Sequence, residues 1–387
     1  MVTHVVLCGP ANPNELFSGQ KTQLFLGLSG ATVLTELAKG LVNLGIFVTV
    51  VTTSDSVDKV WIRSNGLCKV YVLPHRKRAR EKALDFFKAE RDQIKRLINE
   101  LDCDIVHAHW TYEFALGALS SNKTVLVTAH DSPFTVFRHM PDAYRFFRLL
   151  LAWIVRLKTL NLSAVSNKTK QKWQRQMLWK KPIEIIPNSS SFVSKSKIHI
   201  KSNATKVLAI TEDNKIKNVE TLILAWTLVL KVMPNATLDL VGRGLAKGDR
   251  LEKWATEYGY NKSIHWHGFL EKTSVLKSIS DTDILVQPSR EESFGLTLIE
   301  AMGLGIPVIG GLKSGAVPET IGEAGLLINI NNPFEIADTI ILLLRNPEFR
   351  EKLGKTGKLR VKHNFSRKHV TDKYVSLYEK ILETKNV

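Results

Sequence analysis

Short apolar runs rich in β-branched residues alternate with longer amphipathic segments along the chain, which is typical of repeated βα units and a parallel sheet. The alternation runs through two series. Predicted strands of the first series are residues 5–8, 47–52, 68–73, 104–108, 124–129, 162–165 and 183–186. Those of the second series are residues 206–210, 237–241, 264–267, 284–287, 307–309 and 325–328. We therefore predict the α/β class, with two Rossmann-like domains.

A polar stretch between the two series indicates the domain boundary. Residues 188–191 and 194–197 contain only Asn, Ser and Lys, without apolar periodicity, as expected of a linker. A length of 387 residues also exceeds what one hydrophobic core usually holds. We predict an N-terminal domain at 1–190, a C-terminal domain at 191–366 and a last helix at 367–387. The apolar positions of that helix, which we expect to pack on the N-terminal domain, are Val370, Tyr374, Leu377, Tyr378 and Ile381.

Open α/β sheets bind ligands beyond the carboxyl ends of their strands, so two such domains facing across a cleft would place an active site there. Hydrophobic content of 44% and charged content of 24% are those of a folded, water-soluble chain. The three cysteines lack a CxxC spacing, so we expect neither a disulfide framework nor a zinc site. Because no apolar run spans a bilayer and the start does not resemble a secretory signal, we expect a cytoplasmic protein.

The formal net charge of +17 is the unusual bulk property, and +11 of it lies in residues 1–190. The basic residues cluster at 75–82 and 138–181, close to or interleaved with aromatic residues. Such a surface can bind an anionic membrane or nucleic acid phosphates, or it can be a solvated helix face. No nucleic-acid-binding module is recognised, so we do not expect a nucleic-acid partner. A peripheral position on the inner face of the membrane and a solvated face both stay open.

The segment 288–302 carries the strongest chemical signal, because it follows the predicted strand 284–287 and begins a helix. Backbone amides at a helix start attract a diphosphate, and Gly295 allows close approach. Glu292 and Glu300 lie eight positions apart, and carboxylates accept hydrogen bonds from vicinal hydroxyls. A sugar nucleotide offers a hexose, a diphosphate and a ribose in matching order. The competing interpretation is a pair of acids that only favour the helix dipole.

The segment 288–305, followed by 306–309 and by Pro318 and Glu319, resembles the signature of the retaining glycosyltransferases of family 4, which have the GT-B fold. Similar landmarks occur in the family's order at residues 27–30, 104–109, 128–131, 163–166, 186–188, 240–244 and 267–269. The resemblance implies transfer of a sugar from a nucleotide-diphosphate sugar to a hydroxyl acceptor, such as a lipid-linked glycan in polysaccharide or glycolipid synthesis. It implies no metal and no other cofactor.

The resemblance also implies roles for single residues. Glu300 would bind the ribose and Glu292 the donor hexose, with Lys217 stabilising charge on the leaving diphosphate. His130 would lie beside the donor sugar and the reaction centre. The remaining implied donor-binding residues are Gly30, Phe294, Gly295, Leu296 and Thr297, and further candidates for substrate contact are His109, Lys215 and Arg243.

One departure from the family concerns the phosphate clamp. The family places an arginine five or six residues before the lysine, where this chain has Glu212 and Thr211. Either Lys215 supplies a second positive charge from a shifted loop, or Lys217 and backbone amides neutralise the phosphates alone. Two competing functions therefore stay open, a sugar-nucleotide 2-epimerase and a non-catalytic sugar-nucleotide-binding subunit. The glutamate spacing argues against the first, and Glu212 favours the second.

Four histidines lie on predicted strands. We assign His107 and His109 to opposite faces of their strand, so that only one of them lines the ligand edge. His265 and His267 flank a tryptophan, and they either approach the nucleobase or have a structural role.

The sequence Asp281-Thr282-Asp283 imitates a metal-binding DxD motif. Because a core strand follows at once, we expect these acids to cap the preceding helix or turn instead.

Overall fold

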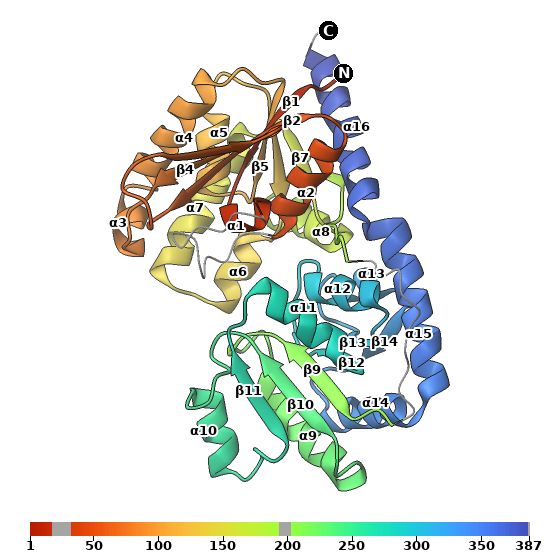
Figure 1. Ribbon diagram of the computed structural model, residues 1–387. Helices are drawn as coiled ribbons and strands as arrows, with labels where there is room; N and C mark the ends of the chain where they lie inside the picture. Colours follow the sequence, from red (N-terminus) through yellow and green to blue (C-terminus); the bar gives the residue numbers. More distant parts are fainter. Residues whose placement is uncertain (18–31, 193–202, 386–387) are drawn as a thin grey trace. The chain divides into compact units, whose positions relative to one another are not determined.

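The computed structural model describes residues 1–17, 32–192 and 203–385, and it confirms the predicted α/β class with two mainly parallel sheets (Figure 1). The chain divides into two compact units. The first contains Met1–Ser189 together with Arg367–Val387, and the second contains Ser190–Ser366. Within the described residues, no helix has the length and apolar character needed to cross a bilayer.

The first unit is built on an eight-stranded sheet of order β3-β4-β2-β1-β5-β6-β7-β8. Its strands are β1 (His4–Cys8), β2 (Phe47–Ser54), β3 (Trp61–Asn65), β4 (Cys68–Pro74), β5 (Ile105–His109), β6 (Val125–Ala129), β7 (Asn161–Ala164) and β8 (Glu184–Ile185). All neighbours run parallel except β3, which pairs antiparallel with β4. The sequence did not predict β3, because this edge strand is polar and largely exposed and so carries no apolar run.

Helices cover this sheet and join its strands. They are α1 (Pro13–Leu16), α2 (Thr32–Asn43), α3 (Ala79–Leu84), α4 (Lys88–Glu100), α5 (Glu113–Leu119), α6 (Pro133–His139), α7 (Ala143–Lys158), α8 (Asn167–Gln176) and α16 (Arg367–Lys385). The last helix lies beside α2, as Figure 1 shows. A Cβ atom added to Gly40 of α2 would lie 2.0 Å from Oγ1 of Thr371. The backbone of α2 at Gly40 is therefore in close contact with the side chain of Thr371 on α16. The predicted packing of the C-terminal helix on the N-terminal domain is therefore confirmed.

Two kinds of contact hold α16 in place. Tyr374 and Tyr378 are buried in the hydrophobic core on this side of the sheet. Nε of Arg367 donates to Oε2 of the buried Glu36 on α2 at 2.8 Å. Removal of α16 would therefore uncover core side chains and a buried carboxylate, both of which are costly.

The second unit is built on a six-stranded parallel sheet of order β11-β10-β9-β12-β13-β14. Its strands are β9 (Lys206–Ile210), β10 (Thr237–Val241), β11 (Ile264–Gly268), β12 (Ile284–Gln287), β13 (Val308–Gly311) and β14 (Gly325–Ile328). Its helices are α9 (Val219–Val232), α10 (Arg250–Glu257), α11 (Lys272–Asp281), α12 (Leu296–Leu304), α13 (Val317–Ile321), α14 (Pro333–Arg345), α15 (Pro347–Arg360) and the π-helix Val361–Phe365. Every strand predicted for this half is present.

In both units an aspartate just before a central strand fastens the start of the neighbouring strand. Oδ2 of Asp104 accepts hydrogen bonds from the backbone N–H groups of Thr3 and His4 at 2.6 and 2.9 Å. Oδ2 of Asp283 accepts from the N–H groups of residues 205 and 206, both at 2.9 Å. Asp283 thus holds the start of β9, a role that the sequence analysis did not predict. These two partners lie 77 and 78 positions away in the sequence.

We expect Asp283→Ala to lower the free energy of unfolding by about 1–3 kcal/mol, because two strand N–H groups lose a charged acceptor. The matched control is Asp281→Ala, since Asp281 is exposed and is the last residue of α11, two positions before Asp283. Thermal unfolding of the two variants measures the difference. Equal midpoints for both variants would contradict the strand-fastening role.

Candidate active site

The start of α12 is the centre of the candidate site in the second unit. It follows β12 after a loop of eight residues, and Gly295 occupies the N-cap position with φ 92°. A side chain rarely adopts this left-handed conformation, so glycine is required there. The first amides of a helix lack acceptors within the helix, so those of Gly295, Leu296 and Thr297 form a place where an anion can bind.

Glu292 lies in the loop before α12 and is held by two donors. Nζ of Lys217 lies 2.5 Å from Oε1 of Glu292. Nε2 of Gln287, at the carboxyl end of β12, donates to the same oxygen at 2.8 Å. The other end of the Gln287 amide accepts from Oγ1 of Thr297 at 3.1 Å, which links the loop to the helix. The structure therefore brings together Lys217, Glu292 and Thr297, and it adds Gln287, which the sequence analysis missed.

Glu300 lies one turn inside α12 and is almost fully buried. Its carboxylate forms an ion pair with the ammonium of Lys272, the first residue of α11. Lys272 also lies 5.7 Å from the centre of the Phe192 ring. The sequence analysis missed Lys272, because nothing in its local sequence separates it from the many surface lysines.

Position 315, which lies against the backbone of Glu292, has room for glycine only. Gly315 has φ 62°, and a Cβ atom there would lie 2.2 Å from Oε1 of Glu291 and from the carbonyl oxygen of Glu292. The N–H of Ala316 donates to that same carbonyl at 2.8 Å. Phe294 is buried against Phe365 at a ring distance of 5.5 Å, so it supports the loop from the core side.

The loop 211–218 carries Lys217 and the departure from the family pattern. Glu212 and Lys215 are both exposed. Arg290, in the loop that leads to Glu292, donates from Nη1 to the carbonyl oxygen of Lys215 at 2.5 Å. Its backbone N–H donates to the carbonyl of Ile216 at 2.7 Å. A guanidinium group that the sequence analysis did not consider is thus fastened to this loop.

Arg243 and the histidines of β11 make other contacts. The guanidinium of Arg243 lies 5.5 Å from the centre of the Phe269 ring. His265 and His267 both contact Oδ1 of Asp239. These contacts do not include Glu292 or Glu300.

In the first unit, three histidines gather at the carboxyl ends of β5 and β6. The rings of His107 and His109 lie 4.2 Å apart, so the two residues share one face of β5 and the assignment to opposite faces was wrong. Side chains alternate along a strand, and residues two apart therefore point the same way. Nδ1 of His109 lies 2.9 Å from Nε2 of His130, and the Trp110 ring stacks on His130 at 4.2 Å.

All three histidines are buried, and burial determines their protonation state. Burial lowers the pKa of His107 and of His130 well below the usual range, and it lowers the pKa of His109 to about 3. The rings are therefore neutral near pH 7. His107 is fixed further by Tyr378 of α16, whose hydroxyl lies 2.7 Å from Nδ1, and by Thr128 at 2.6 Å from Nε2.

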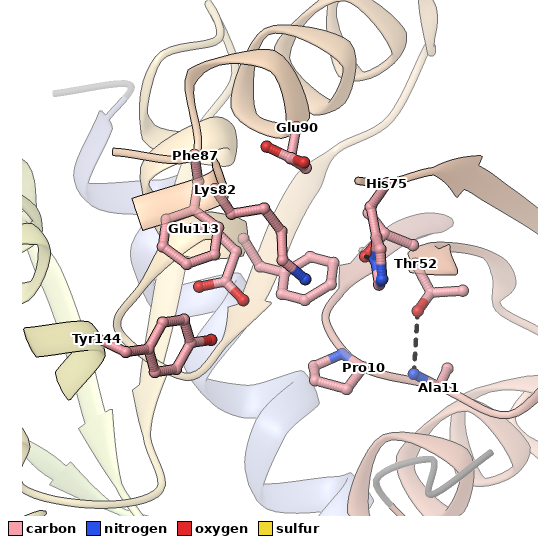
Figure 2. A pocket seen from close by; sticks show the side chains of 11 residues that line it. Pro10, Ala11, Thr52, His75, Lys82, Phe87, Glu90, Glu113 and Tyr144 are labelled. Carbon is pink, nitrogen blue, oxygen red and sulfur yellow. Dashed lines mark hydrogen bonds between the residues drawn. The ribbon is translucent and has the colours of Figure 1, made fainter. Parts of the chain in front are cut away.

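A cavity of about 240 Å³ opens at the carboxyl ends of β1, β2 and β4 (Figure 2). Figure 2 shows Lys82, Glu113 and Tyr144 directed into the same space. The carboxylate of Glu113 lies 4.0 Å from the guanidinium of the part-buried Arg148. The residues that line the cavity are Pro10, Ala11, Thr52, Thr53, His75, Lys82, Phe87, Glu90, Glu113, Phe114 and Tyr144. No residue of this cavity was a predicted site residue.

Not every positive charge near this cavity is available to a ligand. Arg76 donates to Glu90 at 2.6 Å and to Asp85 at 2.9 Å, and these hydrogen bonds raise its pKa further. Arg76 and Glu90 therefore bind each other, whereas the ammonium of Lys82 points into the cavity. Gly30, the remaining predicted donor-binding residue, lies outside the described residues.

The sequence matches two models of known protein families. Residues 191–360 match the family model "Glycosyl transferases group 1", and residues 30–189 match the model "Glycosyltransferase Family 4". The chain belongs to glycosyltransferase family 4. It is a glycosyltransferase with the GT-B fold, as the resemblance in the sequence implied.

Curated relatives carry out transfer onto different acceptors. The N-acetyl-alpha-D-glucosaminyl L-malate synthase of Bacillus anthracis is 25% identical over 300 residues, which are 72% of this chain and 75% of the relative. A GDP-mannose-dependent monoacylated alpha-(1-6)-phosphatidylinositol monomannoside mannosyltransferase of Corynebacterium glutamicum is 30% identical over 158 residues. That alignment spans 39% of this chain and 40% of the relative.

Solved structures show the same fold over almost the whole chain. Sucrose-phosphate synthase of Thermosynechococcus elongatus superimposes with a TM-score of 0.77 at 18% identity, covering 99% of this chain and 100% of that one. WaaG, a glycosyltransferase involved in lipopolysaccharide biosynthesis, gives a TM-score of 0.70 at 15% identity, covering 97% and 99%.

Proposed function

We propose that this glycosyltransferase moves a sugar from a nucleotide-diphosphate sugar to a hydroxyl acceptor with retention of the anomeric configuration. The observation that carries the proposal is the ion pair between Lys217 and Glu292, 2.5 Å long, beside the glycine-led start of α12. A second pair, between Lys272 and Glu300, lies further along the same helix. A cation, helix-start amides and two carboxylates thus belong to the first turns of α12 and the loop contacts before it.

Each part of the donor has a matching group. The diphosphate would take the amides of Gly295 to Thr297 and the ammonium of Lys217. The carboxylate of Glu292 would accept hydrogen bonds from hexose hydroxyls, and that of Glu300 from the ribose diol. Lys215 and Arg290 add positive charge on the adjoining loop in place of the family's arginine. The donor base and the donor sugar are not specified by these contacts.

The chemistry follows from where charge develops. As the bond between the sugar and the diphosphate breaks, negative charge grows on the leaving phosphate, and Lys217 with the helix amides stabilises it. The acceptor hydroxyl attacks from the same face that the diphosphate leaves and passes its proton to the departing phosphate oxygen, so no protein carboxylate has to act as a nucleophile. His130 is neutral because it is buried, and it can therefore exchange hydrogen bonds with sugar hydroxyls without adding charge.

The cavity of the first unit is our candidate for the acceptor. It is lined by an ammonium, a carboxylate and a phenol, which suit a polar, hydroxylated molecule. The names of the relatives support an acceptor of this kind, since one is an N-acetyl-alpha-D-glucosaminyl L-malate synthase and another is a phosphatidylinositol monomannoside mannosyltransferase. A glycan or a lipid-linked glycan is the acceptor class that we propose.

A lipid-linked acceptor would bring the protein to a membrane. Large apolar side chains are exposed on and after α7, including Phe146, Leu157 and Leu160, with Leu157 71% exposed. Exposed Lys180 and Lys181 follow Leu160 by 20 and 21 positions in the sequence. Apolar side chains beside lysines are typical of a surface that rests on anionic lipid, at about 1 kcal/mol for each cation near the surface.

Glu300→Ala should raise the KM for the donor about tenfold or more, because the ribose loses its acceptor. Glu292→Ala should instead lower kcat by roughly 10- to 100-fold, because the hexose and Lys217 lose their orientation. Steady-state kinetics with a radiolabelled nucleotide sugar separates the two effects. The charge-matched control is Glu291→Ala on the same loop, and parental kinetics in both test variants would refute the donor assignment.

Lys82→Ala and Glu113→Gln should raise the KM for the acceptor roughly tenfold while the KM for the donor stays the same, since both line only the cavity of the first unit. Lys88→Ala is the control, because Lys88 is exposed and pairs with Asp92 on α4. The acceptor for these measurements is chosen by screening hydroxylated carboxylates and lipid-linked glycans. A change in donor KM alone would count against this cavity as the acceptor site.

Sedimentation of the protein with lipid vesicles tests the proposed binding to a membrane. We expect the protein to sediment with phosphatidylcholine vesicles that contain phosphatidylglycerol and to stay in solution with pure phosphatidylcholine. Leu157→Ser combined with Leu160→Ser should weaken sedimentation severalfold. Binding that does not depend on anionic lipid or on these leucines would refute it.

A further inference from the structure

A separate group of metal-ligating side chains lies on the sheet of the second unit, at its edge. Asp239 belongs to β10, and His265 and His267 belong to β11, which is the edge strand of this sheet (Figure 1). Each residue offers one ligating atom, and the three atoms lie within 4.8 Å of one another. In the part of the chain that the structure describes, no other group of three such side chains converges in this way.

The strands dictate this convergence. Asp239 pairs in register with His265, so the two side chains are nearest neighbours on one face of the sheet. Trp266 points to the opposite face, where its Nε1 donates to Oδ1 of Asn261 at 2.6 Å. His265 and His267 flank this tryptophan and are therefore both directed to the face that carries Asp239.

The backbone that carries His267 is fixed as well. His267 bridges to Ala246, and the N–H of Gly268 donates to the carbonyl of Leu245 at 2.9 Å. The three side chains thus project from paired strands and not from a free loop. A site built on such elements keeps its ligands in place before an ion arrives.

The distances fit those of a small metal ion. Zinc takes nitrogen and oxygen ligands at about 2.0–2.2 Å in a tetrahedral arrangement, which places neighbouring ligand atoms about 3.3 Å apart. Nδ1 of His265 lies 3.2 Å from Oδ1 of Asp239, and Nε2 of His267 lies 2.6 Å from the same oxygen. An ion between the three atoms, which all lie within 4.8 Å of one another, would replace the hydrogen bond of His267 to Asp239 and move the two side chains apart.

The surroundings allow an ion to enter. The side chains of His265 and His267 are 55% and 41% exposed, and that of Asp239 is 23% exposed. Two imidazoles with one carboxylate are a set that zinc, nickel and cobalt prefer, whereas magnesium and calcium prefer oxygen ligands alone.

We propose that Asp239, His265 and His267 form a binding site for a divalent first-row transition metal ion, with zinc as the reference ion. The three protein ligands leave the remaining coordination positions to water or to an exchangeable anion. A bound ion would tie the edge strand β11 to β10. The site is distinct from the groups at the start of α12, so metal binding does not depend on the proposed donor chemistry.

Calorimetric titration of the chelator-treated full chain with ZnCl₂ tests the proposal. We expect one equivalent to bind in the parent protein, with affinity at least tenfold lower in His265→Ala and in His267→Ala, because each loses one of three ligands. MgCl₂ should give no binding to this site. Cobalt as a spectroscopic probe should give the strong visible absorption of a four-coordinate ion in the parent protein and lose it in both variants.

Two further variants distinguish the loss of a metal ligand from a general effect on the protein. His363→Ala removes an exposed histidine from the same unit and should leave the zinc affinity unchanged. Asp239→Asn keeps the shape of the side chain but not its charge, and it should weaken zinc binding while far-ultraviolet circular dichroism stays that of the parent protein. Zinc affinity that is the same in the His265, His267 and Asp239 variants as in the parent protein would overturn the proposal.

Discussion

Two lysine–glutamate pairs at one helix start are the interaction on which the candidate chemistry depends. A glutamate beside a diphosphate is unfavourable unless a cation compensates it, and a part-buried lysine is unfavourable without an anion. Lys217 with Glu292, and Lys272 with Glu300, satisfy both requirements while no substrate is bound. In the proposed function, the same four side chains would present donors and acceptors to a ligand that carries both phosphates and hydroxyls.

The two units solve the same structural problem in the same way. In each, an aspartate just before a central strand holds the start of the neighbouring strand, which is the first strand of that unit. This leaves the opposite, carboxyl ends of the strands to carry ligand-binding groups, as open α/β sheets do. The histidine cluster and the cavity of the first unit, and the glutamates of the second, all lie at such ends.

The first unit also depends on the end of the chain. Tyr374 and Tyr378 of α16 reach the core, and the hydroxyl of Tyr378 lies 2.7 Å from His107. His107 in turn packs on His109, which contacts His130. The orientation of a proposed catalytic ring is thus supported by side chains more than 240 positions away in the sequence.

The sequence by itself determined the fold class, nearly all of the strands and the segment that carries Glu292 and Glu300. These features are local, since apolar periodicity and a strand-loop-helix motif can be recognised within about twenty residues. The structure decided what depends on strand order and register. It paired Lys217 with Glu292 across 75 positions, brought Lys272 to Glu300, placed His107 and His109 on one face, and gathered Asp239 with His265 and His267. A single sequence does not determine these contacts, because each joins elements that become neighbours only when the sheet forms.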